Sequence, residues 1–326
     1  MEIGVGLDVT LGLSLDQQAE MSREAARVGY TSIWTPEGNG YDSFHLCLQR
    51  WSASRDVTPG GVQTGIAVSP VAWRTPMAFA MAAGTLTELT GGRFMLGLGA
   101  GGQTSGVLAT MREYVTGVRG LLAGEEVAGA RLAIQPPPGT PVYLGALGPE
   151  MLRLAGEAAD GAALNWCSPE QIAWSRERIA EGAIRAGREP ATIRVVEYIR
   201  VCVDDDVDLA RRAYAKALMP YALGNRAPTE RERERGYRAH FERMGFAEAL
   251  AGLDRMREGG APDDQIVDAF PPELLLRVGY FGRAAGAGAA FHRLAEGLDL
   301  AIVRVVAARP GAADSTLAVM RACVTP

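Results

Sequence analysis

The chain has 326 residues, of which 48% are hydrophobic, and its formal net charge is −5. This length and apolar content exceed a minimal domain and suit one large α/β domain that spans residues 1–326. The negative charge argues against nucleic acid as the main partner, because phosphate binding needs a basic surface.

Neither a metal site nor a disulfide framework is expected. The cysteines and histidines stand apart, without the CxxC or Cys/His spacing of a zinc site. They are Cys47, Cys167, Cys202, Cys323, His45, His240 and His292. The N-terminus begins directly on a strand pattern, and no apolar run reaches 18 residues. We therefore expect a soluble cytoplasmic protein that does not contact a membrane.

The first predicted unit is a strand, a helix and a second strand. Ile3–Val9 is apolar and strand-like. Ser14 can cap the helix that follows, with Gln17 completing a capping box. Gly29 ends that helix, since glycine adopts the left-handed conformation without steric cost. Tyr30–Thr35 is the second predicted strand.

The same alternation of a short apolar run and an amphipathic helix continues along the chain. The later strands are predicted at Val62–Val68, Phe94–Leu98, Pro141–Leu144, Gly161–Leu164, Ile193–Val203 and Leu300–Val306. Eight strands, each followed by a helical pattern, predict a closed (β/α)8 barrel of the TIM type. A doubly wound open sheet is the alternative fold.

Residues 225–275 interrupt this rhythm. They contain the charged run 228–235 and then a helical periodicity from Met244 to Met256. We interpret them as a helical insertion between the last two strands. The insertion is either a solvated appendage or a lid over the active-site mouth.

Acidic side chains stand at the predicted ends of the first two strands. In such barrels the active site forms at the C-terminal ends of the strands. Asp8 and Glu37 are therefore the candidate catalytic residues, as groups that accept or donate a proton. A purely structural role is the other interpretation of Glu37, and Asp42 is expected to cap a helix.

Two glycine-rich turns follow the fourth and fifth strands, at Gly99–Gly102 and Gly145–Gly148. Backbone without Cβ atoms can approach a ligand closely, and the next helix offers free N–H groups to an anion. A cofactor phosphate is one occupant, and a simple tight turn is the alternative. The spacing is a poor Rossmann fingerprint, because no acidic residue follows at the required distance.

Several of these segments carry a family resemblance. Residues 64–76, continued at 89–99, resemble the signature region of luciferase-like monooxygenases, as do 29–34 and 141–149. The closest likeness is to the deazaflavin branch, which includes methylene-tetrahydromethanopterin reductase. The resemblance implies a (β/α)8 barrel that pairs as a homodimer and binds coenzyme F420, with FMN as the alternative cofactor.

The resemblance also implies a coenzyme site. It places a non-prolyl cis peptide at Gly65–Ile66, behind the central ring of the coenzyme. The coenzyme contacts would be Gly65, Ile66, Ala67, Gly99, Ala100, Gly101, Gly102, Gly145, Ala146, Leu147, Gly148 and Asn165. The chemistry would be hydride transfer, which the coenzyme performs and the protein orients.

The sequence also departs from this branch. The acid-histidine pair that follows the second strand in the branch falls here on Glu37 and Gly38, so the histidine is absent. Neither a sugar phosphate nor a pterin is therefore expected as substrate. The first hypothesis is an F420-dependent oxidoreductase acting on a small organic molecule. The alternatives are an FMN-dependent monooxygenase supplied by a partner reductase, and a non-catalytic deazaflavin-binding protein.

Overall fold

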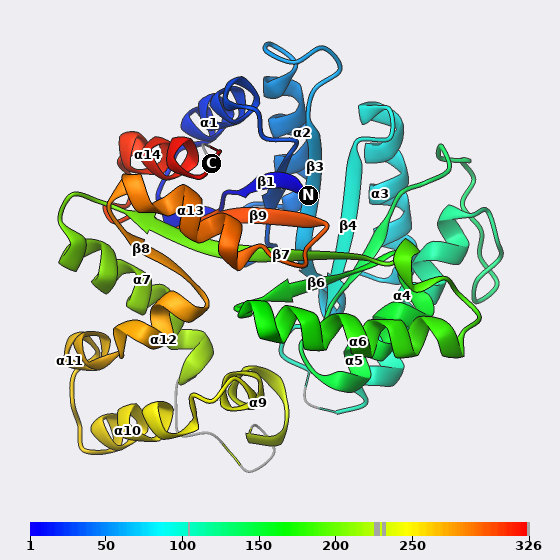
Figure 1. Cartoon of the computed structure of the whole chain (residues 1–326). Helices are drawn as coiled ribbons and strands as arrows, with labels where there is room; N and C mark the ends of the chain where they lie inside the picture. The colour runs from blue at the N-terminus through cyan, green and yellow to red at the C-terminus, as the bar shows by residue number, and fades with distance from the viewer. Residues whose placement is uncertain (104, 225–228, 230–232, 325–326) are drawn as a thin grey trace.

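A ring of parallel strands surrounded by helices forms the body of the molecule (Figure 1). The computed structural model describes residues 1–103, 105–224, 229 and 233–324. The strands are β1 (Glu2–Gly6), β2 (Ser32–Thr35), β3 (Gln63–Pro70), β4 (Phe94–Gly99), β5 (Val142–Gly145), β6 (Gly161–Asn165), β7 (Arg194–Val203), β8 (Gly279–Gly282) and β9 (Leu300–Val305). The longer helices are α1 (Leu15–Val28), α2 (Ser43–Ser54), α3 (Pro76–Thr90), α4 (Val107–Leu122), α5 (Pro149–Ala158), α6 (Pro169–Arg185), α7 (Val207–Ala222), α9 (Gly236–Arg243), α10 (Ala247–Glu258), α11 (Asp263–Ala269), α12 (Pro272–Arg277), α13 (Ala284–Leu294) and α14 (Ala313–Val324).

Eight of these strands close into a barrel. β1 to β7 pair in sequence order, and β9 pairs with both β7 and β1 to complete the ring. Every pairing is parallel. The predicted (β/α)8 barrel is thus confirmed with all eight predicted strands, and the open-sheet alternative is wrong.

The extra strand β8 was not predicted. It pairs with β7 from Arg200 to Val203, directly after the pairing between β6 and β7 ends at Tyr198. β8 therefore takes the position beside β7 that the shorter β6 leaves free.

In chain order, helices α9 to α12 follow α7 and precede β8. They form a group beside the barrel (Figure 1). They pack on α7 and β8 through a cluster of buried apolar side chains that includes Tyr214, Phe241 and Phe270. The fold therefore includes the predicted helical insertion. Residues 225–228 and 230–232 of the predicted range lie outside the described residues.

Local sequence signals set the ends of helices α1 and α2. Ser14 and Gln17 form the predicted capping box of α1, and Gly29 ends that helix at φ 98°. Asp42 caps α2, accepting hydrogen bonds from the backbone N–H groups of Phe44 and His45, each at 3.0 Å. The expected capping role of Asp42 is confirmed.

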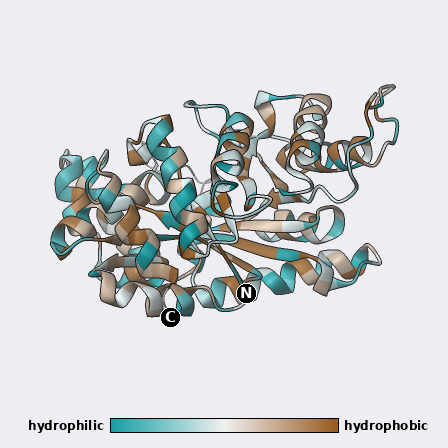
Figure 2. Ribbon diagram, turned by 90° about the horizontal axis from the view of Figure 1, so that it is seen from above, coloured by the Kyte–Doolittle hydropathy of each residue, from teal (hydrophilic) through white to brown (hydrophobic). Residues whose placement is uncertain are grey.

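Two apolar layers hold the barrel together. One lies between strands and helices, and the other fills the barrel with large side chains such as Trp34, Met95, Tyr143 and Tyr198. Figure 2 shows hydrophobic residues along the strands and hydrophilic ones along much of the surrounding helices. Within the described residues, no helix is both long and apolar enough to cross a membrane.

Candidate active site

Asp8, at the end of β1, forms an ion pair with Arg304 of β9. The Oδ1 atom of Asp8 also accepts hydrogen bonds from the backbone N–H and the hydroxyl of Thr10, at 2.9 and 2.5 Å. Both partners are buried, with 8% of each residue exposed. Burial lowers the pKa of Arg304 to about 9, so the guanidinium stays charged at neutral pH.

Glu37, at the end of β2, is held by Arg74, which follows β3. The two terminal nitrogens of Arg74 donate to the two carboxylate oxygens of Glu37 at 2.5 and 2.7 Å, and Ser69 donates to the same carboxylate. Arg74 also reaches Asp42 at 2.5 Å. The backbone N–H of Glu37 donates to the carbonyl of Val68 at 3.2 Å. Glu37 therefore ties β2 to the end of β3 through both side chain and backbone.

The two candidate carboxylates share one cavity of about 220 Å³ at the barrel mouth. The lining residues are Asp8, Val9, Thr35, Pro36, Glu37, Gly38, Gly40, Tyr41, Leu46 and Tyr221. Tyr221 comes from the end of α7, and the other residues lie after β1, at and after the end of β2, and on α2. The structure thus brings together the two residues that the strand-end argument selected.

The non-prolyl cis peptide lies at Ala67–Val68, so its predicted position at Gly65–Ile66 is wrong. Regular pairing with β4 continues through Ile66, and the register shifts only between Ile66 and Ser69. The irregular segment therefore begins two residues later than the resemblance suggested.

This correction separates the three residues predicted on β3. A Cβ atom on Gly65 would lie 2.5 Å from the ring of Trp34, so this glycine is packed inside the barrel. The side chain of Ile66 is fully buried in the layer between strands and helices. Only Ala67 lies at the irregular segment.

The residues of the two predicted glycine-rich turns also fall into two groups, those packed against other side chains and those open to a ligand. Gly99 and Gly145 face the side chain of Val68: a Cβ atom on Gly99 would overlap this side chain, and one on Gly145 would lie only 3.2 Å from it. Gly101 has φ +61°, which favours glycine in the turn. Gly102 and Gly148 have no heavy atom within 4 Å of the Cβ position, so a ligand could approach their backbone. Of the remaining turn residues, Ala146 is buried.

Replacing Gly99, the last residue of β4, by alanine is expected to lower the free energy of unfolding by about 1–3 kcal/mol. The new methyl group would overlap the side chain of Val68 on β3. Urea unfolding of the purified protein measures this change. Gly102→Ala is the matched control and should shift stability by less than about 0.5 kcal/mol. Equal effects of the two substitutions would contradict the packing role of Gly99.

Asn165, predicted to contact the coenzyme, lies between two groups that the sequence analysis missed. Its Oδ1 atom accepts a hydrogen bond from Arg200 of β7 at 2.5 Å, and its amide donates to the hydroxyl of Tyr237 at 2.6 Å. Arg200 and Arg304 are direct neighbours across β7 and β9. Arg304 is the only charged residue of β9 and Arg200 is the last charged residue of β7, so a charge late in a strand was the signal that could have identified both arginines.

Helix α9 of the insertion is bonded to the segment after β6. Besides Tyr237, His240 donates from Nε2 to the carbonyl of Trp166 at 2.8 Å. Burial lowers the pKa of His240 to about 4, so the ring is neutral at neutral pH. Trp166 has φ +59° and is fully buried. The insertion therefore fixes the residues that follow β6 at the mouth.

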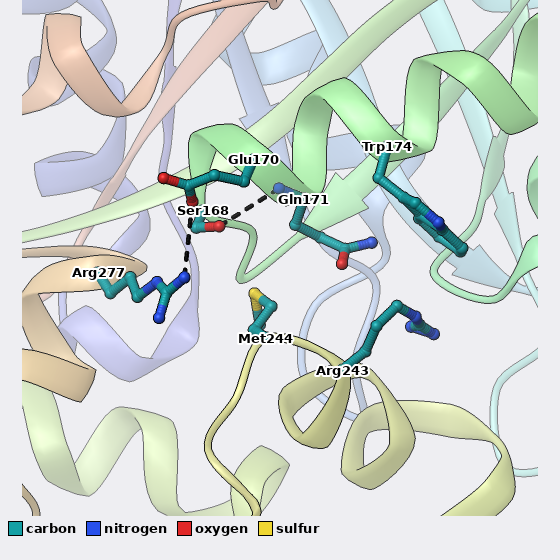
Figure 3. Close-up of a pocket in the computed structure, with 7 residues that line it drawn as sticks. All are labelled: Ser168, Glu170, Gln171, Trp174, Arg243, Met244 and Arg277. Atoms are coloured by element: carbon teal, nitrogen blue, oxygen red, sulfur yellow. Dashed lines mark hydrogen bonds and ion pairs between the residues drawn. The ribbon is translucent and has the colours of Figure 1, made fainter.

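A second cavity of about 180 Å³ lies between the start of α6 and the insertion (Figure 3). Ser168 caps α6, and Arg277 lies 3.9 Å from Glu170. Arg243 stacks on the ring of Trp174 at 4.6 Å. Neither Asp8 nor Glu37 lines this cavity, so we assign the candidate active site to the first one.

No cluster suited to a metal ion occurs among the residues that the structure describes. The four cysteines are buried and free.

A parallel (β/α)8 barrel with its charged groups gathered at the strand ends has the layout of a barrel enzyme. Residues 2–270 match the family model described as luciferase-like monooxygenase. The chain belongs to this family.

The relatives agree with this assignment. The chain is 29% identical over 270 residues to the 5,10-methylenetetrahydromethanopterin reductase of Methanolobus tindarius, covering 77% of this chain and 81% of the relative. It is 28% identical over 313 residues to a Mycobacterium tuberculosis protein provisionally named as a coenzyme F420-dependent oxidoreductase, covering 84% and 87%. The solved coenzyme F420-dependent tetrahydromethanopterin reductase of Methanopyrus kandleri superposes with a TM-score of 0.73 at 19% identity, covering 99% of both chains. This last likeness supports the fold.

Proposed function

We propose that the protein is an oxidoreductase that transfers a hydride between coenzyme F420 and a small organic substrate. The observation that carries the proposal is the cavity at the barrel mouth, which brings Asp8 and Glu37 together. The name of the Mycobacterium tuberculosis relative, which gives coenzyme F420, supports the choice of coenzyme.

The residues around the mouth fit such a coenzyme. Gly102 and Gly148 leave open space above their backbone, and Gly148 precedes the first turn of α5. Free N–H groups at a helix start suit an anionic tail. We propose that Ala67, Asn165 and the open backbone at Gly102 and Gly148 hold the coenzyme, which supplies the carbon that carries the hydride.

We propose Glu37 and Asp8 as the groups that accept a proton from the substrate or orient it. Each carboxylate forms an ion pair with an arginine, so each is an acceptor in this arrangement. The side chain of Glu37 is 3% exposed and lines the cavity. A carboxylate in this position can hold a substrate hydroxyl while the hydride moves.

Titration of the purified protein with coenzyme F420 and with FMN tests the proposal. We expect saturable binding of F420, seen as a change in its visible absorbance and as heat in calorimetry, and much weaker binding of FMN. Binding of FMN alone would instead support the two-component monooxygenase with a partner reductase. Binding of neither coenzyme contradicts both functions.

Glu37→Gln separates catalysis from coenzyme storage. With reduced F420 and a carbonyl substrate that the wild type turns over, the variant is expected to lose about a hundredfold in rate and keep its F420 affinity. Asp42→Asn is the control, because Asp42 also bonds Arg74 but does not line the cavity. Full activity of Glu37→Gln would remove Glu37 from the proposed mechanism.

We also propose that the protein is a cytoplasmic homodimer. Helix α3 carries exposed Met81 and Leu89, each with more than half of its surface accessible, which suits burial against a second copy. Sedimentation velocity measures the assembly state, and a monomer at micromolar concentration would contradict this part of the proposal.

A further inference from the structure

Arg200 is a buried cation at the barrel mouth that has no acidic partner among the described residues. The residue is 5% exposed, and its guanidinium forms no ion pair within the described part of the chain. Its hydrogen bonds go from Nη1 to Asn165 at 2.5 Å and to the carbonyl of Tyr198 at 3.5 Å. An isolated buried charge is costly unless a partner compensates it.

The surrounding charged groups do not supply that partner. Arg304, the neighbour of Arg200 across the sheet, is already paired with Asp8. Glu197 lies on the same strand, but its Oε1 atom accepts from the backbone N–H of Cys167 at 2.6 Å. Burial raises the pKa of Glu197 to about 8, so this carboxyl is largely uncharged at neutral pH. Among the residues that the structure describes, none therefore neutralises the positive charge of Arg200.

The guanidinium is nevertheless rigidly placed. It lies 3.7 Å from the centre of the Trp166 ring and 5.2 Å from that of Tyr221. Tyr221 also lines the cavity that holds Asp8 and Glu37, so Arg200 adjoins the proposed substrate site. Such stacking orients a planar cation without removing its hydrogen-bond donors.

One edge of this guanidinium remains available. The Nε and Nη2 atoms donate no hydrogen bond to the described residues, and neither belongs to the enclosed polar atoms without a partner. These two donors form the fork edge that binds two oxygens of one anion side by side.

We infer that the substrate of this enzyme carries a carboxylate or a similar oxyanion, which Arg200 binds through its Nε and Nη2 edge. The inference rests on the proposed function in one respect, because only that function makes the bound anion part of a substrate. Asn165 is then a positioning residue, because its Oδ1 atom accepts the hydrogen bond from Nη1 of Arg200, and its amide is in turn bonded to the hydroxyl of Tyr237.

The probe for this site is acetate, with acetamide as its neutral counterpart, titrated without coenzyme while tryptophan fluorescence is followed. We expect saturable acetate binding by the wild type and none of acetamide. Arg200→Gln should weaken acetate binding at least tenfold, and Arg200→Lys, which keeps the charge but loses the fork, should be intermediate. The lysine variant serves as the test if the glutamine variant does not fold.

Arg243→Gln is the matched control, because Arg243 also stacks on a tryptophan but lies at the second cavity. It should bind acetate as the wild type does. Unchanged acetate binding by Arg200→Gln, loss in Arg243→Gln alone, or no binding by the wild type at about 50 mM acetate would each overturn the inference.

A parallel titration with coenzyme F420 identifies the source of the anion. We expect Arg200→Gln to bind F420 with wild-type affinity, as required if the anion belongs to the substrate. A tenfold loss of F420 affinity would show that Arg200 binds the coenzyme, and would overturn the inference. If F420 does not bind even to the wild type, the acetate titration still reports on Arg200, so the two failures are distinguishable.

Discussion

Glu197→Gln is expected to raise the free energy of unfolding by about 3 kcal/mol at pH 7. Glu197 is 1% exposed, and its Oε2 atom has no hydrogen-bond partner within the described residues. Burial raises its pKa from the ordinary value near 4.5 to about 8. At neutral pH the folded protein must therefore keep a proton that the unfolded chain releases, and glutamine removes this cost.

The pH dependence gives this prediction its sign. Between pH 4.5 and about 8 the folded state binds one more proton at Glu197 than the unfolded state does. The contribution of this group to stability is complete below pH 4.5 and is lost as pH rises towards 8. Wild-type stability should fall across this interval, and the slope should be smaller for the glutamine variant.

Urea unfolding between pH 5 and 9 measures both effects. Glu170→Gln is a suitable control, because Glu170 is exposed on the first turn of α6. A glutamine variant at position 197 that is no more stable than the wild type at pH 7 would contradict the burial of an uncharged carboxyl there. Glutamine can still accept the hydrogen bond from Cys167, so the backbone contact is not the variable.

The barrel could be predicted from the sequence because the patterns that mark its strands and helices are local. Periodicity, a capping box before α1 and glycine at its end each involve residues within one turn of one another. β8 was not predicted because it is only four residues long, begins and ends in glycine, and is paired only with the second half of β7. A strand of that composition has no alternation to detect.

Only part of the candidate site could be predicted from the sequence, and the reason is different. Asp8 and Glu37 are marked by their positions at strand ends, but the arginines that pair with them come from 296 and 37 residues further along the chain. No local pattern specifies such long-range partners. The role of each glycine in the glycine-rich turns could not be predicted from the sequence. A glycine that makes room for a neighbouring side chain, as Gly99 does for Val68, looks the same in the sequence as one that admits a ligand.

Asp8→Asn is expected to have the largest effect on stability, a loss of about 3–5 kcal/mol. The substitution keeps the acceptor for Thr10 but removes the only carboxylate that pairs with Arg304 among the described residues. Arg304 would then be a second buried cation beside Arg200, its direct neighbour across the sheet. Thermal and urea unfolding at pH 7 measure the loss.

A double variant and a pH series separate the charge effect from simple disruption. Asp8→Asn/Arg304→Met should recover most of the lost stability, because an apolar side chain of similar length removes the unpaired charge. Burial already lowers the pKa of Arg304 to about 9, and loss of Asp8 lowers it further. The folded variant then releases a proton that the unfolded chain retains, so its stability should rise with pH from a lower starting point than in the wild type. A single variant within about 1 kcal/mol of the wild type would mean that water reaches Arg304, and the ion pair would then no longer explain how the end of β1 is held at the mouth.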